Sequence, residues 1–323
     1  MRMLPVVAAF GVFVAGCDGD SGNNRNNRMD PGPMGFVSLS ITDGPWHDAS
    51  SLVLHVTHVE FGHVNGNILR MDFPGAPINF DLMQLHNGAS LQFINRMAVP
   101  VGQYQWMRLG LDINQCHLDD AQTGGRHNLH MGQNSGNWLQ ANEPFQIMEG
   151  MHHEFMLDYD IRLGLHHQHM GGMGDRFELH QAMRCMNMAN VGGLTGTIDP
   201  SLIDLNHPDC DPAPGGNWAY LFPGDAASPD DIADTDTDGV PGPIATDRVD
   251  MRIATGEYFY HFGHLNEGSY RVAFTCSGEW DESGDDDYPT DPDGRFDFQM
   301  FSDPVDVVAG EMQHHDLGPA WSK

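Results

Sequence analysis

The feature that most constrains the fold of this chain is a repeated alternation of apolar and polar side chains with a period of two residues. Residues 37–42 read VSLSIT, and similar runs lie at 106–113, 155–162 and 270–276. Successive side chains of a strand point to opposite faces of a sheet, so this period indicates half-buried β-strands. Short strands separated by turns rich in Gly, Pro and Asp are typical of antiparallel β-sandwiches.

Two local departures refine this expectation. In residues 52–61 the apolar phase slips, which predicts a β-bulge or a strand that is covered on both faces. Apart from one turn at 81–85, no window shows the 3.6-residue period of an amphipathic helix. We therefore expect an all-β fold.

The acidic side chains divide the chain into two parts. Residues 191–323 hold 27 acidic and 5 basic side chains, whereas residues 1–190 hold 18 and 10. A shift of this size is typical of a domain boundary, and 323 residues suffice for two domains of ordinary size. We expect two antiparallel β-sandwich domains, 35–190 and 191–323, of the Greek-key, immunoglobulin-like or transthyretin-like kind.

The net charge limits the possible partners. It is −30, and Lys323 is the single lysine. Such a charge repels phosphate groups, which argues against nucleic acid and anionic lipid headgroups as partners. It suits a salty medium or cationic ligands.

The first residues have the form of an export signal. One arginine precedes an apolar run at 4–14, which is too short to cross a bilayer as a permanent helix. The run ends in VAGC at 14–17, which resembles the lipobox of bacterial lipoproteins. The resemblance implies that residues 1–16 are a lipoprotein signal peptide and that Cys17 becomes the lipidated first residue. An ordinary export signal is the alternative.

Lipidation implies attachment to a membrane through a lipid anchor. Each buried CH₂ group contributes about 0.8 kcal/mol of membrane affinity, so several acyl chains hold a protein essentially permanently. We expect a cell-envelope location at the outer or inner membrane, either periplasmic or surface-exposed. Residues 17–34 hold almost no apolar side chains, so we expect a disordered tether of roughly 20 to 25 Å after the lipidated cysteine.

Four cysteines follow the lipidated one, two in each predicted domain. An even number per domain in an exported protein predicts disulfides, so we expect Cys116 to pair with Cys185, and Cys210 with Cys276. The spacing matches neither a CxxC zinc site nor a redox motif. Free thiols that bind copper are the alternative.

Four motifs occur in order along the first predicted domain. They are GFVSLSITDGP at 35–45, INFDLMQLHNG at 78–88, VPVGQYQWMRLGL at 99–111 and FMLDYDIRLGL at 155–165. Together they resemble the signatures of a bacterial lipoprotein family catalogued as domain of unknown function 4382, over about residues 35–190. The resemblance implies an envelope lipoprotein with a β-sandwich and no established activity. It departs at LHHQHMGGMGD, residues 165–175, where such proteins usually carry an ordinary turn.

The second predicted domain carries a looser resemblance. The stretches GGLTGTI at 192–198, NWAYLFPG at 217–224 and HLNEGSYRVAFTC at 264–276 are similar to carboxypeptidase-regulatory-like or transthyretin-like modules. Such modules are often appended to exported proteins, which implies a spacer or a binding unit.

Histidine and methionine are concentrated between residues 151 and 188. In the loop that we expect at 165–175, the candidate metal ligands are His166, His167, His169, Met170 and Met173. Imidazole together with thioether suits copper, and histidine also suits nickel or zinc. The alternative is that methionines fill core gaps while histidines solvate an acidic protein, since methionine is frequent throughout the chain.

An acidic loop predicts a calcium site. Asp234, Asp236 and Asp238 have the DxDxDG spacing that presents alternate carboxylates to Ca²⁺. The glutamate that an EF-hand needs at the twelfth position is replaced by Ala245, so the motif is incomplete. Solvated acidic loops are the alternative.

A last constellation bears on catalysis. Asp158, Asp160 and Arg162 alternate along a predicted strand, and this arrangement indicates a surface ion-pair ladder rather than an acid–base pair. The motifs GxSxG and HExxH and a Gly-rich phosphate loop are absent from the sequence, so we expect no catalytic residues.

We therefore expect a non-enzymatic, lipid-anchored envelope protein that binds or spaces other envelope proteins or glycans. The alternative is a periplasmic or surface metal-handling protein that holds copper or another transition metal, with acidic loops stabilised by calcium.

Overall fold

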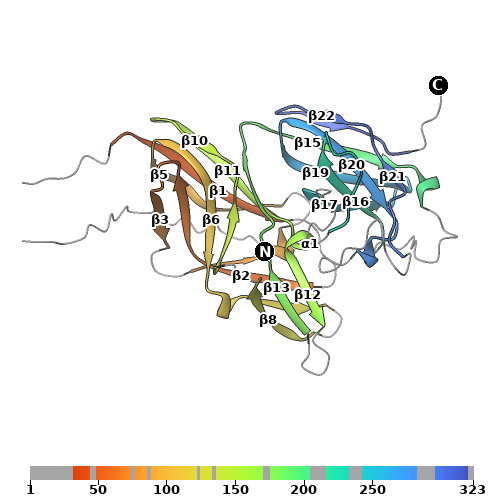
Figure 1. Ribbon diagram of the computed structural model, residues 1–323, viewed down its shortest axis with the longest axis horizontal. Helices are drawn as coiled ribbons and strands as arrows, with labels where there is room; N and C mark the ends of the chain where they lie inside the picture. The colour runs from red at the N-terminus through yellow and green to blue at the C-terminus, as the bar shows by residue number, and fades with distance from the viewer. Residues whose placement is uncertain are drawn as a thin grey trace, which may run out of the picture.

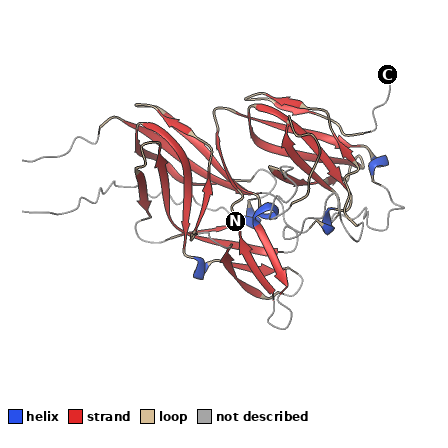
Figure 2. Cartoon of the chain, viewed as in Figure 1, coloured by secondary structure: helices blue, strands red, loops and turns tan. Residues whose placement is uncertain are grey.

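The computed structural model of the chain describes residues 32–43, 49–73, 77–85, 89–121, 124–132, 136–169, 175–203, 216–232, 242–281 and 295–318. Strands make up nearly all of the regular structure, and they form two bodies that lie side by side (Figures 1 and 2). The prediction of an all-β fold is therefore confirmed. In the described part of the chain, no helix has the length and apolar character needed to cross a membrane.

The first body is a sandwich of two sheets. Sheet I contains, in spatial order, β14 (Met183–Asn187), β11 (His152–Tyr159), β1 (Met34–Asp43) and β5 (Leu91–Pro100). The main path of sheet II runs through β10 (Phe145–Ile147), β6 (Gly102–Leu111), β2 (Ala49–His63), β7 (His117–Asp120), β8 (Arg126–Met131), β13 (Asp175–Leu179) and β12 (Leu165–His169). Off this path, β3 (Ile68–Asp72) and β4 (Ile78–Asp81) pair with β2, and β9 (Trp138–Ala141) pairs with β6.

The long strand β2 shows why the apolar phase of the sequence slips. Leu54 and Val56 point into the core, and so do Val59 and Phe61, all with no exposed surface. The pairing of β2 with β6 shifts register between Val56 and His58, which confirms the predicted bulge. Each such side chain contributes about 1.5 to 3 kcal/mol when it is fully buried.

The second body is also a sandwich of two sheets. Sheet III contains β18 (Asp250–Arg252), β19 (Glu257–Asn266), β15 (Val191–Ile198) and β23 (Met312–His314). Sheet IV contains β17 (Ala245–Arg248), β16 (Trp218–Pro223), β20 (Gly268–Thr275) and β21 (Met300–Phe301), with β22 (Val305–Val307) paired to β20. Apolar side chains of both sheets share one core, among them Leu194, Tyr260, Leu221 and Phe274.

Most neighbouring strands are antiparallel, as predicted, but three pairs are parallel. These are β1 with β11, β8 with β13, and β15 with β23. Parallel neighbours require a long crossover connection, which the alternation pattern of a single strand does not reveal. The Greek-key connectivity of both sandwiches stays a prediction.

The described helices are short. The expected turn at 81–85 is the 3₁₀ helix η1 (Leu82–Gln84). Other 3₁₀ turns are η2 (Ile113–Gln115), η4 (Pro200–Leu202) and η5 (Gly278–Trp280). One α-helical turn, α1 (Ile161–Gly164), follows β11 and lies where the two bodies meet (Figure 1).

Candidate functional site

The histidine-rich segment predicted as a metal-binding loop is a β-hairpin. His166 and His167 are neighbours on β12, which pairs with β13. Because adjacent strand residues point to opposite faces, the two imidazoles separate: His166 is 4% exposed, whereas His167 is exposed to solvent. The expectation of one loop folding around an ion is therefore wrong for these two residues.

Each of the two imidazoles packs against another ring. His166 stacks on His180, with ring centroids 3.6 Å apart and an interplanar angle of 6°. His167 stacks on Phe177 at 4.5 Å and 5°. Its Nε2 atom also lies 3.4 Å from Asp175 Oδ1. Both imidazoles thus use their faces for packing.

A buried carboxylate accompanies the inner histidine. Glu178 of β13 lies directly opposite His166 on one neighbouring strand and His130 on the other. It is 4% exposed, and its carboxylate lies 2.7 Å from Arg176 Nη2 and 3.5 Å from His180 Nε2. The sequence pattern had not singled out this carboxylate.

The remaining predicted metal ligands cannot be placed. The side chain of His169, and the residues Met170 and Met173, lie outside the described residues. Among the side chains that the structure does describe, no group of three or more His, Cys, Asp or Glu is arranged to hold a metal ion. A copper site that includes the hairpin tip stays a prediction.

The acidic loop predicted to bind calcium also lies outside the described part. This holds for Asp234, Asp236 and Asp238. Calcium binding there stays a prediction.

The predicted disulfide between Cys116 and Cys185 is wrong, because both are free, buried thiols. Cys116 follows η2 beside sheet II and accepts a hydrogen bond from the backbone N–H of His55, whereas Cys185 lies on β14 of sheet I. An even cysteine count does not show which side chains meet in space. Cys276 is disulfide-bonded, and Cys210, its predicted partner, lies outside the described residues.

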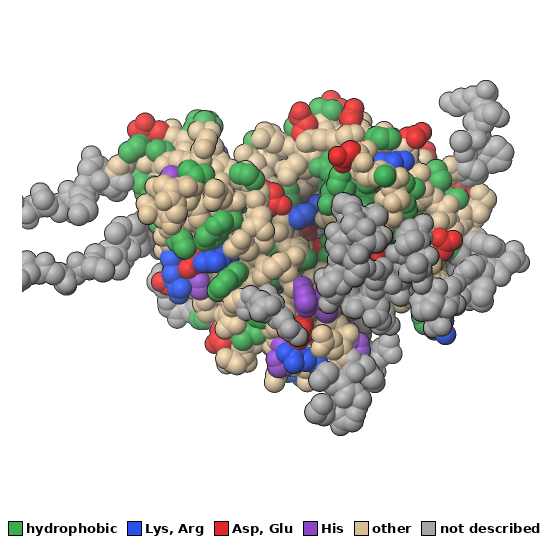
Figure 3. Space-filling model, viewed as in Figure 1, with side chains coloured by type: hydrophobic (Ala, Val, Ile, Leu, Met, Phe, Trp, Pro, Cys, Tyr) green, Lys and Arg blue, Asp and Glu red, His purple; other side chains and the backbone are tan. Residues whose placement is uncertain are grey.

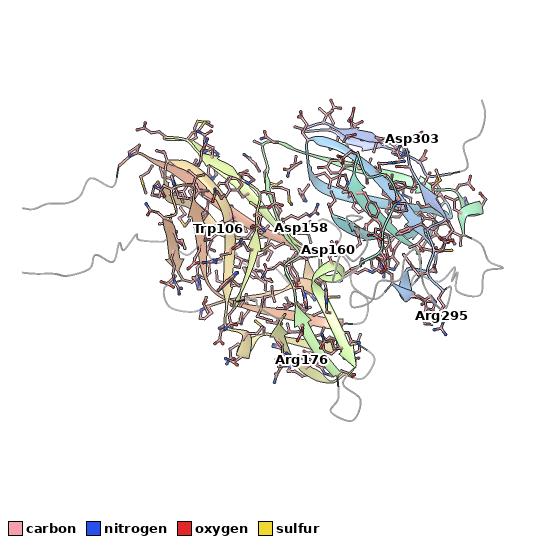
Figure 4. All side chains as sticks on the ribbon, in the orientation of Figure 1. Trp106, Asp158, Asp160, Arg176, Arg295 and Asp303 are labelled. Atoms are coloured by element: carbon pink, nitrogen blue, oxygen red, sulfur yellow. The ribbon has the colours of Figure 1, made fainter. Side chains whose placement is uncertain are left out.

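A buried polar cluster joins the two sandwiches. It is built around Asp160 and Arg162, which we name the junction pair. Asp160 directly follows β11, and Figure 4 places it where the two bodies meet. Asp160 is 2% exposed and Arg162 is 6% exposed. The prediction that these side chains form a surface ladder is therefore wrong, since the chain leaves the sheet at Tyr159 and turns into α1.

Asp160 serves both bodies at once. Its Oδ1 atom caps α1 by accepting hydrogen bonds from the N–H groups of Arg162 (3.0 Å) and Leu163 (3.2 Å). Its Oδ2 atom accepts hydrogen bonds from the backbone N–H of Thr246 on β17 (2.7 Å) and from the hydroxyl of Thr246 (3.1 Å). One carboxylate therefore ties the end of the first sandwich to an edge strand of the second.

Arg162 enters the second sandwich directly. Its guanidinium carbon lies 4.1 Å from the centroid of the Trp218 ring and 5.1 Å from that of Tyr220. Nη2 donates a hydrogen bond to the carbonyl of Gly278 and lies 3.5 Å from Asp281 Oδ2. The guanidinium is thus held by two aromatic faces, a carbonyl and a carboxylate.

The carboxylate of Asp281 balances the positive charge of Arg162. Asp281 also accepts hydrogen bonds from the hydroxyl of Tyr220 and from the N–H of Ile232 (3.1 Å). Burial raises the pKa of Asp281, and the Arg162 guanidinium opposes this shift. Burial also raises the pKa of Asp160, partly offset by the hydrogen bond from Thr246.

Asp158 is the remaining member of the predicted ladder. It lies on β11 with 8% exposure and pairs with Arg184 of the adjacent strand β14. Burial disfavours the charged form of Arg184, but the carboxylates of Asp158, Asp160 and Glu143 together outweigh this effect and raise the pKa of Arg184. Asp158 therefore does form an ion pair, but the pair is largely buried and is not part of a surface ladder.

The junction pair connects the two sandwiches and does not form an open reaction site. Both side chains are buried, and Asp160 Oδ2 and Arg162 Nη2 form hydrogen bonds with the second sandwich. Arg162 forms a buried ion pair with Asp281 of the second sandwich, and the removal of one partner of such a pair costs several kcal/mol. This contact therefore fixes the position of α1 relative to the second sandwich.

Comparison with known proteins gives one family match. Residues 34–174 match the family described as "Domain of unknown function (DUF4382)". The resemblance inferred from the four motifs is therefore confirmed for this region. No curated protein matches the sequence significantly.

Solved structures resemble the chain only loosely. A leucine-rich repeat protein from Bacteroides thetaiotaomicron shares 8% identity and a TM-score of 0.23; the match covers 88% of this chain but only 26% of that protein. A family CBM26 module of Eubacterium rectale Amy13K, solved with maltoheptaose, shares 8% identity with coverages of 87% and 90% and a TM-score of 0.18. The minor pilin GBS52 of Streptococcus agalactiae shares 8% identity, with coverages of 87% and 94% and a TM-score of 0.19. These TM-scores are too low to support an inference about fold or ligand.

Proposed function

We propose that this chain is a non-enzymatic, lipid-anchored protein of the bacterial cell envelope, with a binding or structural role at the surface or in the periplasm. The lipobox-like VAGC sequence supplies the anchor at Cys17, and residues 17–34 supply the tether. The two sandwiches are the part presented to other envelope proteins or glycans. The net charge of −30 argues against a nucleic-acid partner.

The observation that carries the proposal is the junction pair. Two sandwiches on a plain linker would move independently, whereas here Asp160 and Arg162 of one body are buried against Thr246, Trp218 and Asp281 of the other. Burial of charged groups at a junction is stable only when the geometry is kept, because a displaced partner leaves a charge without compensation. We infer that the two sandwiches together act as a rigid spacer, which holds any binding face in a fixed orientation relative to the tether.

Distance measurement between spin labels tests this rigidity. Labels at Asn67→Cys and Ile253→Cys sit on exposed turns of the first and second sandwich, whereas the native free thiols are buried. We expect one narrow distance distribution for the double-labelled protein and a broad one after Arg162→Met. A broad distribution in the otherwise unchanged protein would contradict the rigid spacer.

A metal-handling role is a second proposal. It is favoured by the stack of His166 on His180 beside the buried carboxylate of Glu178, which gathers imidazole and carboxylate groups on one face of sheet II. A site of that kind requires further ligands from the tip of the hairpin. Metal retention after exposure to copper and zinc tests it.

A further inference from the structure

An aromatic and basic surface lies on the outer face of sheet II, far along the chain from the junction pair. We name it the Trp106 face, and it consists of Trp106, Arg108, Trp138, His58 and Glu60. In Figure 3, hydrophobic, basic and histidine side chains gather over β3 and β6 on the side turned to the viewer, and Figure 4 labels Trp106 there. Trp106 and Arg108 belong to the motif at 99–111, but the sequence assigned them no binding role.

The strand register places these side chains on one side of the sheet. Glu60 of β2 lies directly opposite Arg108 of β6, and Gly62 lies opposite Trp106. On the other side of β6, Gly110 lies opposite Trp138 of β9. Cross-strand partners of an antiparallel pair share a face, so the members of the Trp106 face form adjacent rows.

Glycines of the neighbouring segments let the rings lie low over the backbone. A Cβ atom at Gly62 would collide with the indole of Trp106, and one at Gly136 would collide with the indole of Trp138. Gly110 is covered in the same way by the imidazole of His58. These three rings therefore lie close to the backbone of the neighbouring segments.

Arg108 lies between the two tryptophans. Its guanidinium carbon is 4.4 Å from the ring centroid of Trp106 and 4.4 Å from that of Trp138. Nε donates to Glu60 Oε2 at 2.6 Å. Within the described residues, the two Nη atoms have no hydrogen-bonded partner, and they remain available to a ligand.

The charges of the face are balanced together with Arg70 and Asp72 of the neighbouring strand β3. Glu60 lies within 3.6 Å of both Arg70 Nη1 and His58 Nε2, in addition to its contact with Arg108. Arg70 also pairs with Asp72 at 2.8 Å. Two arginines are thus matched by two carboxylates, which makes the face locally neutral in a chain of net charge −30.

We propose that the Trp106 face binds a neutral polysaccharide. Indole rings contact the C–H faces of pyranose rings through dispersion and weak C–H···π interactions, while guanidinium and amide groups donate to sugar hydroxyls. Trp138 is 37% exposed, and Gln140 lies beside Arg108 on β9. A polymer of uncharged sugars fits a locally neutral face, whereas anionic polymers are repelled by the acidic chain. The inference rests on the proposed envelope role and names its ligand class.

Affinity electrophoresis of the full chain tests the proposal. The gels contain one neutral polysaccharide each: an α-glucan, a mixed-linkage β-glucan, a β-mannan or a β-xylan. We expect at least one to retard the protein, with the dissociation constant raised about tenfold or more in Trp138→Ala, which corresponds to about 1.4 kcal/mol. The control Ile253→Ala removes a 93% exposed apolar side chain of the second sandwich and should bind as the wild type does.

A second variant guards against a local folding defect. Arg108→Gln keeps the strand and both indoles but removes the available Nη donors, so we expect weaker retardation. The contact with Glu60 is lost as well, which lowers stability, so the gels are run at a temperature well below the thermal unfolding of the variant. Retardation by none of the four polysaccharides, equal binding by Trp138→Ala, or binding only to a protein partner would overturn the proposal. Membrane anchoring and the spin-label distances would be unaffected by that result, so the failure of this inference is distinguishable from failure of the envelope role.

Discussion

Arg162→Met removes the guanidinium from the junction while keeping an unbranched side chain of similar length. The variant loses the ion pair with Asp281, the hydrogen bond to the Gly278 carbonyl and the cation–π contacts with Trp218 and Tyr220. Breaking a buried ion pair costs about 3 to 5 kcal/mol, because the remaining charge stays buried. Asp281 keeps two other donors, Tyr220 and Ile232, so we expect the lower end, about 3 kcal/mol of unfolding free energy.

Urea unfolding followed by tryptophan fluorescence measures this loss, since Trp218 contacts the guanidinium and reports on the junction. We expect a lower midpoint for the second sandwich and a separation of the unfolding into two transitions. Arg126→Ala is the control, because Arg126 pairs with Asp119 at an exposed position and its loss should not shift the midpoint. An Arg162→Met midpoint equal to that of the wild type would refute the reasoning.

Three further predictions concern titration, thiols and metals. Burial raises the pKa of Asp160 above its value in the unfolded chain, so the native state holds the proton more tightly. As the pH is lowered from about 7 to about 4, the unfolding free energy of the wild type should therefore rise relative to that of Asp160→Asn. Urea midpoints that show no such gain would contradict this. Burial raises the pKa of Cys116 to about 11 and also raises that of Cys185. Peptide mass spectrometry should therefore find both thiols unmodified after iodoacetamide treatment of the native protein and modified after treatment in urea. Rapid labelling of the native protein would contradict this, because it would mean that both thiols are accessible to solvent. If the envelope role needs no metal, the wild-type protein should hold no stoichiometric copper or zinc after it is exposed to these metals and desalted. Elemental analysis of the double variant His166→Ala, His167→Ala is the comparison. Stoichiometric metal in the wild type that this variant lacks would favour the metal-handling role.

The strands were predictable because their signal is local. Residues 37–42 alternate so regularly that the apolar core positions of β1 follow from the pattern, although Ser38 and Thr42 on the other face are buried as well. The slip at 52–61 correctly indicated the bulge in β2. These features depend on which side chains neighbour each other along a strand. The sequence contains that information directly.

The junction pair was not predictable from alternation. The run DYDIR continues the period of β11, but Asp160 caps α1 and Arg162 is buried among residues that lie more than 50 positions later in the chain. Asp before a short segment that ends in glycine is a helix-capping signal, but the period-two alternation of the run led to the prediction of a continuous strand. The partner residues in the second sandwich carried no such signal.

The Cys116–Cys185 disulfide and the placing of His166 and His167 around one ion were wrong for a related reason. Counting residue types in a segment does not say which faces they occupy: period two separates His166 from His167, and the two sheets separate Cys116 from Cys185. The Trp106 face shows the converse. Its members come from three strands that are far apart in sequence, and only the register brings them together.

The mass of the N-terminal peptide of the protein, isolated from its native membranes, tests the central claim most directly. The account predicts a peptide that begins at Cys17 and carries acyl chains, and it predicts that Cys17→Ser releases the protein into the soluble fraction. A peptide that begins at Met1 without acyl chains would contradict it.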